Sequence, residues 1–425
     1  MKKLILSIIT IIFSFNTYAQ FVQYAVVSSE QELFDSLLVD GIREFHAPIK
    51  HQNFSKAIHA LEQAIELKPN NAIAHYYLGY AYSKQNSLDA RQLPAKSKSL
   101  CIKANNEMRN VIALDSAFKP KLALSPYSKI TAEWGALALM YLYNNDEDSM
   151  KWAFEQGRNN GGFSNFMLAY YRLLLDQCSD STILISSGDD NYWNLLYLQF
   201  EEHYRTDVSI LDLGLLNTLW YQQFLNDHNI LHFQMAPVAE NNYYLVPYND
   251  TLINVPIQGS NTSFFWNYQA RGSNPFYLRY GDVAIRNILI SNEFRRKIFF
   301  TKGIASSDLY HLENHLENQI IVNRLNPFGK SELEESKFYN LAEKTLELAP
   351  LCNLNSTDEW RILDNIRLSI AARIYHDWTS TNGKENAKKL MQLLNRITPS
   401  KTYPYSSPEN KLQMDQFRRV IMEDY

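Results

Sequence analysis

One stretch, residues 182–221, constrains the fold of this chain more than any other. It opens with an apolar, β-branched run over Thr182–Ser187 that stops at Gly188, which is the pattern of a buried strand. A segment with a helical apolar face follows, and Val208–Leu213 is a second buried strand pattern. Because strand, crossover helix and strand form a βαβ unit, the two strands should be parallel and covered by helices. We therefore predict a Rossmann-like α/β domain over residues 179–330.

Polar residues follow both strands of this unit. Asp189, Asp190 and Asn191 come after the first strand, at the carboxyl end where open α/β sheets place their ligands. Asn217 and Thr218 follow the second strand, so we expect them to line the same crevice. In a binding site these residues would hold a metal, sugar hydroxyls or a partner. The alternative is that they close turns and cap the helices that follow, which is the commoner role of such residues.

Helical repeats precede this region. The offsets of the second helix of a tetratricopeptide repeat occur at Ala57, Leu61, Ala64 and Pro69. Those of the first helix of the next repeat occur at His75, Leu78, Gly79 and Tyr82. The second repeat carries an insertion around Ser87–Lys98. We predict a tetratricopeptide-like helical domain over residues 22–178, and a second helical module over residues 331–425.

Between the βαβ unit and the tail the sequence predicts further short elements. The expected strands are Tyr243–Val246, Ile253–Val255 and Lys297–Phe300, and the expected helices are Asp282–Ser291 and Leu309–Leu325. His311 and His315 lie four residues apart on the last of these and could share a metal. Because Glu313 fits neither zinc-protease arrangement, a solvated helix face is the better interpretation of this pair.

The N-terminus has the pattern of an export signal. Lys2 and Lys3 precede an apolar run over Leu4–Phe15, and Thr17-Tyr18-Ala19 offers small residues at the usual cleavage offsets. The run is too short to span a bilayer, so we predict a cleaved signal peptide over residues 1–19. The mature protein is then exported, periplasmic or envelope-associated, and has no membrane span after cleavage.

Composition excludes several classes of function. A formal charge of −4 lacks the basic footprint of a nucleic-acid binder, so we expect no nucleic-acid partner. The three cysteines, Cys101, Cys178 and Cys352, are too far apart for a metal knuckle or a redox pair and are expected to be buried, inert thiols. No phosphate-binding glycine loop and no nucleophile elbow occurs, so we expect no cofactor, no metal and no assigned catalytic residue.

Several motifs in the second half carry a family resemblance. They are Gly188-Asp189-Asp190-Asn191, Leu195–Gln199, Arg205–Val208, Leu216–Tyr221, Asp282–Ile285 with Arg296–Phe300, and the run from Leu312 to Pro327. In this order they resemble the soluble C-terminal portion of bacterial multispanning glycosyltransferases similar to protein O-mannosyltransferases, over residues 181 to about 405. The resemblance places the catalytic residues of those enzymes in a membrane half, and helical repeats stand in its place here. It therefore implies that this chain does not carry out sugar transfer alone.

We predict a non-catalytic, exported interaction or scaffold protein, or an accessory subunit of a cell-envelope assembly. An envelope protein would bind the helical repeats, and a glycan is a second candidate partner at the α/β domain. The alternatives are an enzyme of envelope glycan metabolism that uses Asp189 and Asp190, and a soluble factor that guides a separate membrane transferase.

Overall fold

The computed structural model describes residues 29–48, 50–235, 246–247, 251–272 and 277–422. The predicted signal peptide and most of the expected strand Tyr243–Val246 lie outside these residues. The chain forms two compact units. The first, called the repeat unit here, extends to Leu88 and includes Ser97–Ser116, and the second, the α/β unit, comprises Asp89–Lys96 and the chain from Ala117 onward.

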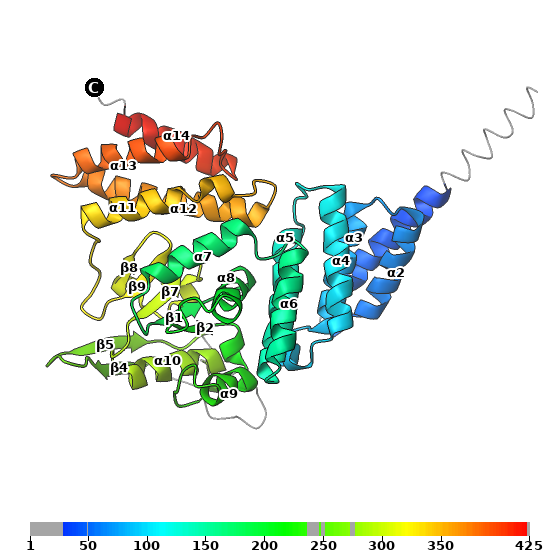
Figure 1. The fold of residues 1–425 in the computed structure, drawn as a ribbon, viewed down its shortest axis with the longest axis horizontal. Coiled ribbons are helices and arrows are strands. Elements are labelled where there is room, and N and C mark those ends of the chain that lie inside the picture. Colours follow the sequence, from blue (N-terminus) through cyan, green and yellow to red (C-terminus); the bar gives the residue numbers. More distant parts are fainter. Residues whose placement is uncertain (1–28, 49, 236–245, 248–250, 273–276, 423–425) are drawn as a thin grey trace, which may run out of the picture. The chain divides into compact units, whose positions relative to one another are not determined.

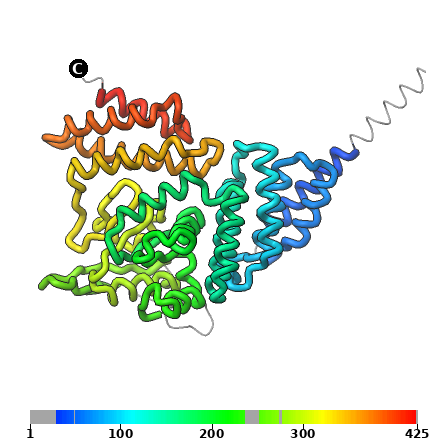
Figure 2. The backbone as a smooth tube through the Cα atoms, viewed as in Figure 1, coloured from blue at the N-terminus to red at the C-terminus, as the bar shows by residue number. Residues whose placement is uncertain are grey.

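The repeat unit is a stack of helices. They are residues 29–45, α2 (Phe54–Leu67), α3 (Ala72–Asn86) and α4 (Lys98–Leu114). Asn53 and Asn71 cap α2 and α3 by accepting backbone N–H groups of the first turn. Helix α3 packs between α2 and α4, so it is buried on most of its surface (Figure 2). A Cβ on Gly79 of α3 would lie 2.6 Å from Cε of Met108 and 3.2 Å from the Ala104 carbonyl oxygen on α4, so glycine here allows these helices to approach closely.

The insertion in the second repeat folds with the other unit. It forms η1 (Ala90–Ala95), a 3₁₀-helix that packs on α5 (Pro126–Tyr143). Trp220 Nε1 donates to the Ala90 carbonyl (2.9 Å), and Lys96 pairs with the buried Glu133 of α5. The insertion is therefore part of the α/β unit, and it is anchored there by the buried Leu93 and Lys96.

A five-stranded mixed sheet lies at the centre of the α/β unit, with the order β2-β1-β7-β9-β8. The strands are β1 (Ile183–Ser186), β2 (Ser209–Asp212), β7 (Ile298–Thr301), β8 (Leu316–Asn318) and β9 (Val322–Leu325). Strand β1 is parallel to both β2 and β7, whereas β9 is antiparallel to β7 and β8. The predicted parallel βαβ unit is confirmed, with α8 (Asp189–Leu196) and one π-helical turn, η2 (Tyr197–Glu201), as the crossover.

Helices cover both faces of the sheet (Figure 1). Helix α8 leads from β1 to β2, and α10 (Tyr280–Asn292) leads back to β7 on the other side of β1. Since parallel crossovers are right-handed, α8 and α10 lie on opposite faces. The α/β unit also contains the helices α6 (Glu147–Asn159), α7 (Asn165–Gln177) and α9 (Leu219–Asp227). Two short antiparallel pairs lie outside the main sheet: β4 (Thr251–Pro256) with β5 (Ser263–Tyr268), and β3 (Val246–Pro247) with β6 (Tyr277–Leu278).

The predicted helix Leu309–Leu325 is wrong. Its residues form 3₁₀ turns and then the antiparallel strands β8 and β9. Leucines at helical spacing suggested a helix. As a strand, however, β9 pairs with β7 and satisfies backbone groups of β7 that a helix in its place would leave without partners. Ile320 adopts a left-handed φ of 66° in the turn between the two strands, and His311 one of 61°. His311 and His315 therefore share no helix face.

The C-terminal part is helical, as predicted. It contains α11 (Glu335–Leu346), the long α12 (Thr357–Thr379), α13 (Lys384–Ile397) and α14 (Pro408–Met422). The guanidinium of the fully buried Arg367 donates to the Tyr403 carbonyl (2.7 Å) and pairs with Asp364, which fixes the loop after α13 onto α12. The predicted helix Asp282–Ser291 and the strands Ile253–Val255 and Lys297–Phe300 fall within α10, β4 and β7, allowing for one-residue shifts at their ends. The domain boundaries at 178 and 330 stay predictions. In the described residues no helix is long and apolar enough to cross a membrane.

Candidate functional site

A cleft of about 760 Å³ opens where the connections of the sheet diverge. Since β1 continues toward β2 on one side and β7 lies on the other, the space beyond their carboxyl ends is the topological switch point, where open α/β sheets bind ligands. We call it the switch-point cleft. It is lined by Ser187–Asn191 after β1, Lys302 and Gly303 after β7, Asn318 and Ile320 at the β8–β9 turn, Tyr170 and Tyr171 of α7, and Arg361, Asn365 and Ser369 of α12.

Two acids start the helix on the β1 side of the cleft. Gly188, with a left-handed φ of 91°, turns the chain out of β1 so that Asp189 and Asp190 form the first turn of α8. Asp189 is exposed and accepts a hydrogen bond from Nε1 of Trp193 (3.1 Å). The first turn of a helix favours carboxylates, so both acids have a structural reason to be here as well as a chemical one.

Asp190 has an unusual environment. Its side chain is only 15% exposed, and Oδ1 is buried without a hydrogen-bond partner among the described residues. Burial, followed by the nearby Asp358 carboxylate, raises the pKa of Asp190 to about 7, against the opposing influence of a hydrogen bond with Ser128 and of Arg361. Nη2 of Arg361 lies 3.6 Å from Oδ2 of Asp190 and 3.3 Å from Oδ1 of Asp358. Asp190 is therefore a carboxyl that can hold a proton near neutral pH.

Asn191 has a structural role at the edge of the cleft. Its Oδ1 accepts from the Tyr171 hydroxyl (2.8 Å), and its Nδ2 donates to the Ser187 carbonyl. These bonds fasten the start of α8 to α7 and to the end of β1. The prediction that Asp190 or Asn191 caps this helix is wrong, because α8 begins at Asp189 with Gly188 as its N-cap and without a side-chain cap bond. Asp189 and Asp190 keep carboxylate oxygens that face the cleft or lack a partner among the described residues.

Lys302 is the cleft residue that the sequence analysis missed. Its Nζ donates to Oδ1 of Asn318 (2.7 Å) and Oδ1 of Asn323 (2.6 Å), two neutral amides. Burial lowers its pKa to about 8, and Lys330 adds to this shift. The available signal was its position directly after the predicted strand Lys297–Phe300, but only the sheet order places that strand beside β1.

Helix α12 forms the opposite wall. Arg361, Asn365 and Ser369 recur every four residues and so present one face of α12 to the cleft. Asp358, in the first turn of this helix, accepts the Ser125 backbone N–H (3.0 Å) and so fixes the helix start against the loop before α5. The cleft therefore brings acids, cations and amides from four separate segments of the chain together.

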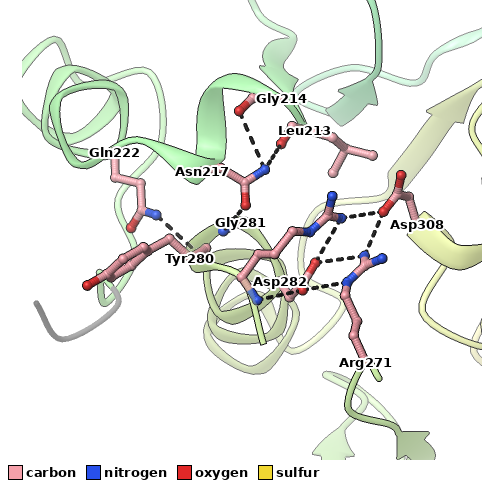
Figure 3. Close-up of polar contacts among 10 residues, drawn as sticks. Leu213, Gly214, Asn217, Gln222, Arg271, Tyr280, Gly281, Asp282 and Asp308 are labelled. Carbon is pink, nitrogen blue, oxygen red and sulfur yellow. Dashed lines mark hydrogen bonds and ion pairs between the residues drawn. The ribbon is translucent and has the colours of Figure 1, made fainter. Parts of the chain in front are cut away.

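Asn217 and Thr218 do not line this cleft. Asn217 donates to the Leu213 carbonyl (2.9 Å) and accepts the Gly281 N–H (3.0 Å), as Figure 3 shows. Thr218 donates to the Leu215 carbonyl (2.7 Å). Both border a separate hollow of about 450 Å³ that also contains Arg279. The expectation of one shared crevice is wrong because β2 is an edge strand, and β1 separates it from β7 at the switch point.

The residues beside this hollow form a closed ion-pair cluster (Figure 3). Arg271 donates to both carboxylate oxygens of the buried Asp282 (2.7 and 2.9 Å) and to Asp308 (2.6 Å), and Arg279 pairs with the same two acids. Burial would raise the pKa of Asp282, but the two guanidinium groups hold it below its ordinary value. Since each charge has a partner, the cluster clamps α10 to its neighbouring loops.

The remaining candidate groups are inert or dispersed. Among the described residues no cluster of three or more His, Cys, Asp or Glu side chains could hold a metal ion. All three cysteines are free thiols; Cys101 and Cys178 are buried, and Cys352 is partly exposed. Burial raises the pKa of both Cys178 and Cys352 to about 12, so neither is a ready nucleophile.

Two family models match parts of the chain. A TPR repeat model matches residues 49–86, which contain α2 and α3. A model described as TMEM260-associated domain 2 matches residues 168–253, from α7 into β4. The second match includes the βαβ unit and the motifs Gly188–Asn191, Arg205–Val208 and Leu216–Tyr221. No curated protein matches the chain.

Proposed function

We propose that this protein is a non-catalytic, exported interaction protein that serves as a scaffold or accessory subunit of a cell-envelope assembly. The observation that carries this proposal is the tetratricopeptide repeat at residues 49–86, because such repeats stack into extended protein-binding surfaces. The α/β unit supplies a second binding surface at the switch-point cleft, where a glycan is the candidate ligand. The match to a TMEM260-associated domain supports an association with a glycosyltransferase-like family.

The first helix of the repeat unit suggests what kind of protein segment would bind. Residues 29–45 carry five acids against one base, and Arg43 is paired with Asp40 (2.8 Å). Leu33 and Val39 on this helix are 51% and 60% exposed. Apolar side chains surrounded by carboxylates suit a partner segment that combines Lys or Arg with apolar residues.

The test is purification of the tagged protein from its native envelope, with crosslinking and mass spectrometry of its companions. Three forms are compared: wild type, the double variant Leu33→Glu with Val39→Glu, and the double variant Asp189→Ala with Asp190→Ala. The proposal expects companions that crosslink to the repeat unit, persist in the Asp variant and are lost in the Leu33/Val39 variant. Companions lost only in the Asp variant would move the docking site to the cleft, and no companions at all would contradict a scaffold.

One observation favours an enzyme as the second candidate. Asp190 has a pKa of about 7 beside an exposed Asp189, so it can donate a proton near neutral pH as a general acid in glycan chemistry. The enzyme predicts glycan cleavage or transfer that is lost in Asp190→Asn, while the envelope companions remain. Turnover that is unchanged in Asp190→Asn would remove this candidate.

A further inference from the structure

Lys302 is a cation with no counter-ion in the part of the chain that the structure describes. No carboxylate of the described residues lies within ion-pairing distance of its Nζ, and the one charged group that perturbs it is another cation, Lys330. An ammonium group has three N–H donors, and the amides of Asn318 and Asn323 take two of them. Buried charges in proteins are normally paired, so an unpaired ammonium at the wall of a cleft is suited to an anion that arrives from solution.

The backbone of the β8–β9 turn fixes the Asn318 amide to which Lys302 donates. Ile320, in the turn between β8 and β9, has a φ of 66°, a conformation that a β-branched residue rarely adopts. Its N–H donates to Oδ1 of Asn318 (2.9 Å), the same oxygen that accepts from Lys302. Ile320 itself lines the cleft. Strained backbone of this kind concentrates at binding sites, where the surrounding structure keeps a side chain in a set position.

We propose that the switch-point cleft binds a small hydroxylated monocarboxylate, of the size and chemistry of a sugar acid, with its carboxylate on the Lys302 ammonium. The inference rests on the proposed ligand-binding role of the α/β unit and is independent of protein binding by the repeat unit.

The acids of the cleft decide between a carboxylate and a phosphate. Asp189 and Asp190 follow β1, Asp358 of α12 lies near Asp190, and Arg361 pairs with Asp190 and Asp358. A phosphate monoester carries close to two negative charges at neutral pH and would be repelled by these groups, whereas a single carboxylate is balanced by Lys302. The exposed Asp189 carboxylate and the Asn365 and Ser369 side chains can then exchange hydrogen bonds with hydroxyl groups of the ligand. The cleft volume of about 760 Å³ exceeds what one sugar ring requires.

Three matched probes test the class of ligand by titration calorimetry on the whole protein. They are glucuronate, glucose, which lacks the charge, and glucose 6-phosphate, which replaces the carboxylate by a dianion. We expect saturable binding of glucuronate, and affinities about tenfold or more weaker for the other two, since a charge-assisted hydrogen bond is lost or a repulsion gained. Tighter binding of glucose 6-phosphate, or equal binding of glucose, would overturn the proposed chemistry.

Two lysine substitutions then locate the anion. Lys302→Met should weaken glucuronate binding about tenfold or more, whereas Lys330→Met, which removes an exposed neighbouring cation, should leave it unchanged. Lys302→Gln removes the charge but keeps an amide donor for Asn318 and Asn323, and it replaces the Met variant if that one does not fold. Equal affinity in wild type and the Lys302 variants, or no binding of glucuronate, gluconate or lactate to wild type, would refute the inference. The Leu33/Val39 variant should bind glucuronate like wild type, so this result and the protein-binding result can fail separately.

Discussion

Replacing Glu133 by alanine should destabilise the α/β unit by about 3–5 kcal/mol, because it removes the carboxylate that two buried ammonium groups share. Glu133 lies on α5, and its side chain is 2% exposed. Its Oε2 is 2.8 Å from Nζ of Lys96, and its Oε1 is 2.8 Å from Nζ of Lys129. The two lysine side chains are themselves only 3% and 10% exposed. Burial would raise the pKa of Glu133, yet the two lysines hold it well below its ordinary value, so the carboxylate stays ionised.

The assay uses the distribution of tryptophan in the chain. All seven tryptophans lie between residues 134 and 378, in the α/β unit, and the repeat unit has none. Tryptophan fluorescence during urea or thermal unfolding therefore reports on the α/β unit alone, whereas far-ultraviolet circular dichroism reports on both units. At about 2–4 °C per kcal/mol for a unit of this size, the fluorescence midpoint of Glu133→Ala should fall by roughly 6–20 °C.

Two further variants separate charge from packing. Glu133→Gln keeps the shape and one acceptor, so it should be less damaging than Glu133→Ala. The triple variant Lys96→Met, Glu133→Leu, Lys129→Met replaces the whole group by apolar side chains and should be near wild type or more stable. If Glu133→Ala costs less than about 1 kcal/mol, the cluster behaves like an exposed ion pair and our account of its burial is wrong.

Three other predictions follow from the same reasoning. Both nitrogens of the buried His75 face acceptors, Glu107 Oε2 (2.5 Å) and the Pro69 carbonyl (2.8 Å). Burial alone would lower the pKa of His75, but these bonds raise it above its ordinary value. The repeat unit should therefore be more stable at pH 6 than at pH 8 by circular dichroism, and His75→Gln should abolish the difference. Gly135→Ala places a Cβ 2.6 Å from Cβ of Trp193, so it should cost about 1–3 kcal/mol in the fluorescence transition, and an unchanged midpoint would show that α5 and α8 can separate freely. Burial raises the pKa of Asp190 to about 7, so the folded carboxyl keeps a proton that the unfolded chain loses near pH 4, and the stability of the unit should fall as pH rises from about 4 to 7. Asp190→Asn should therefore stabilise the unit at pH 8 and change little at pH 4, a contrast that pH-dependent unfolding measures directly.

Local sequence was sufficient for the elements whose pattern is strong. The β-branched run that ends at Gly188 predicted β1, and the run Val208–Leu213 predicted β2 one residue longer at each end than it is. Their parallel pairing followed from the helix between them, since a crossover of that length joins parallel neighbours. The tetratricopeptide offsets likewise predicted α2 and α3 as repeat helices, with Ala57 and Ala64 buried on α2 and Gly79 allowing α3 to approach α4 closely.

Tertiary structure alone decided where the site lies and what it contains. Strand β7 could have added beside β2 or β1, and its place beside β1 puts Lys302 next to Asp189 and Asp190 while it excludes Asn217 and Thr218. The leucines of residues 309–325 fit a helix, but pairing with β7 made strands of them and brought Asn318 to Lys302. The reason is physical. Periodicity records which face of a segment is buried, whereas the order of strands depends on contacts between segments far apart in the chain, and those contacts leave no local pattern.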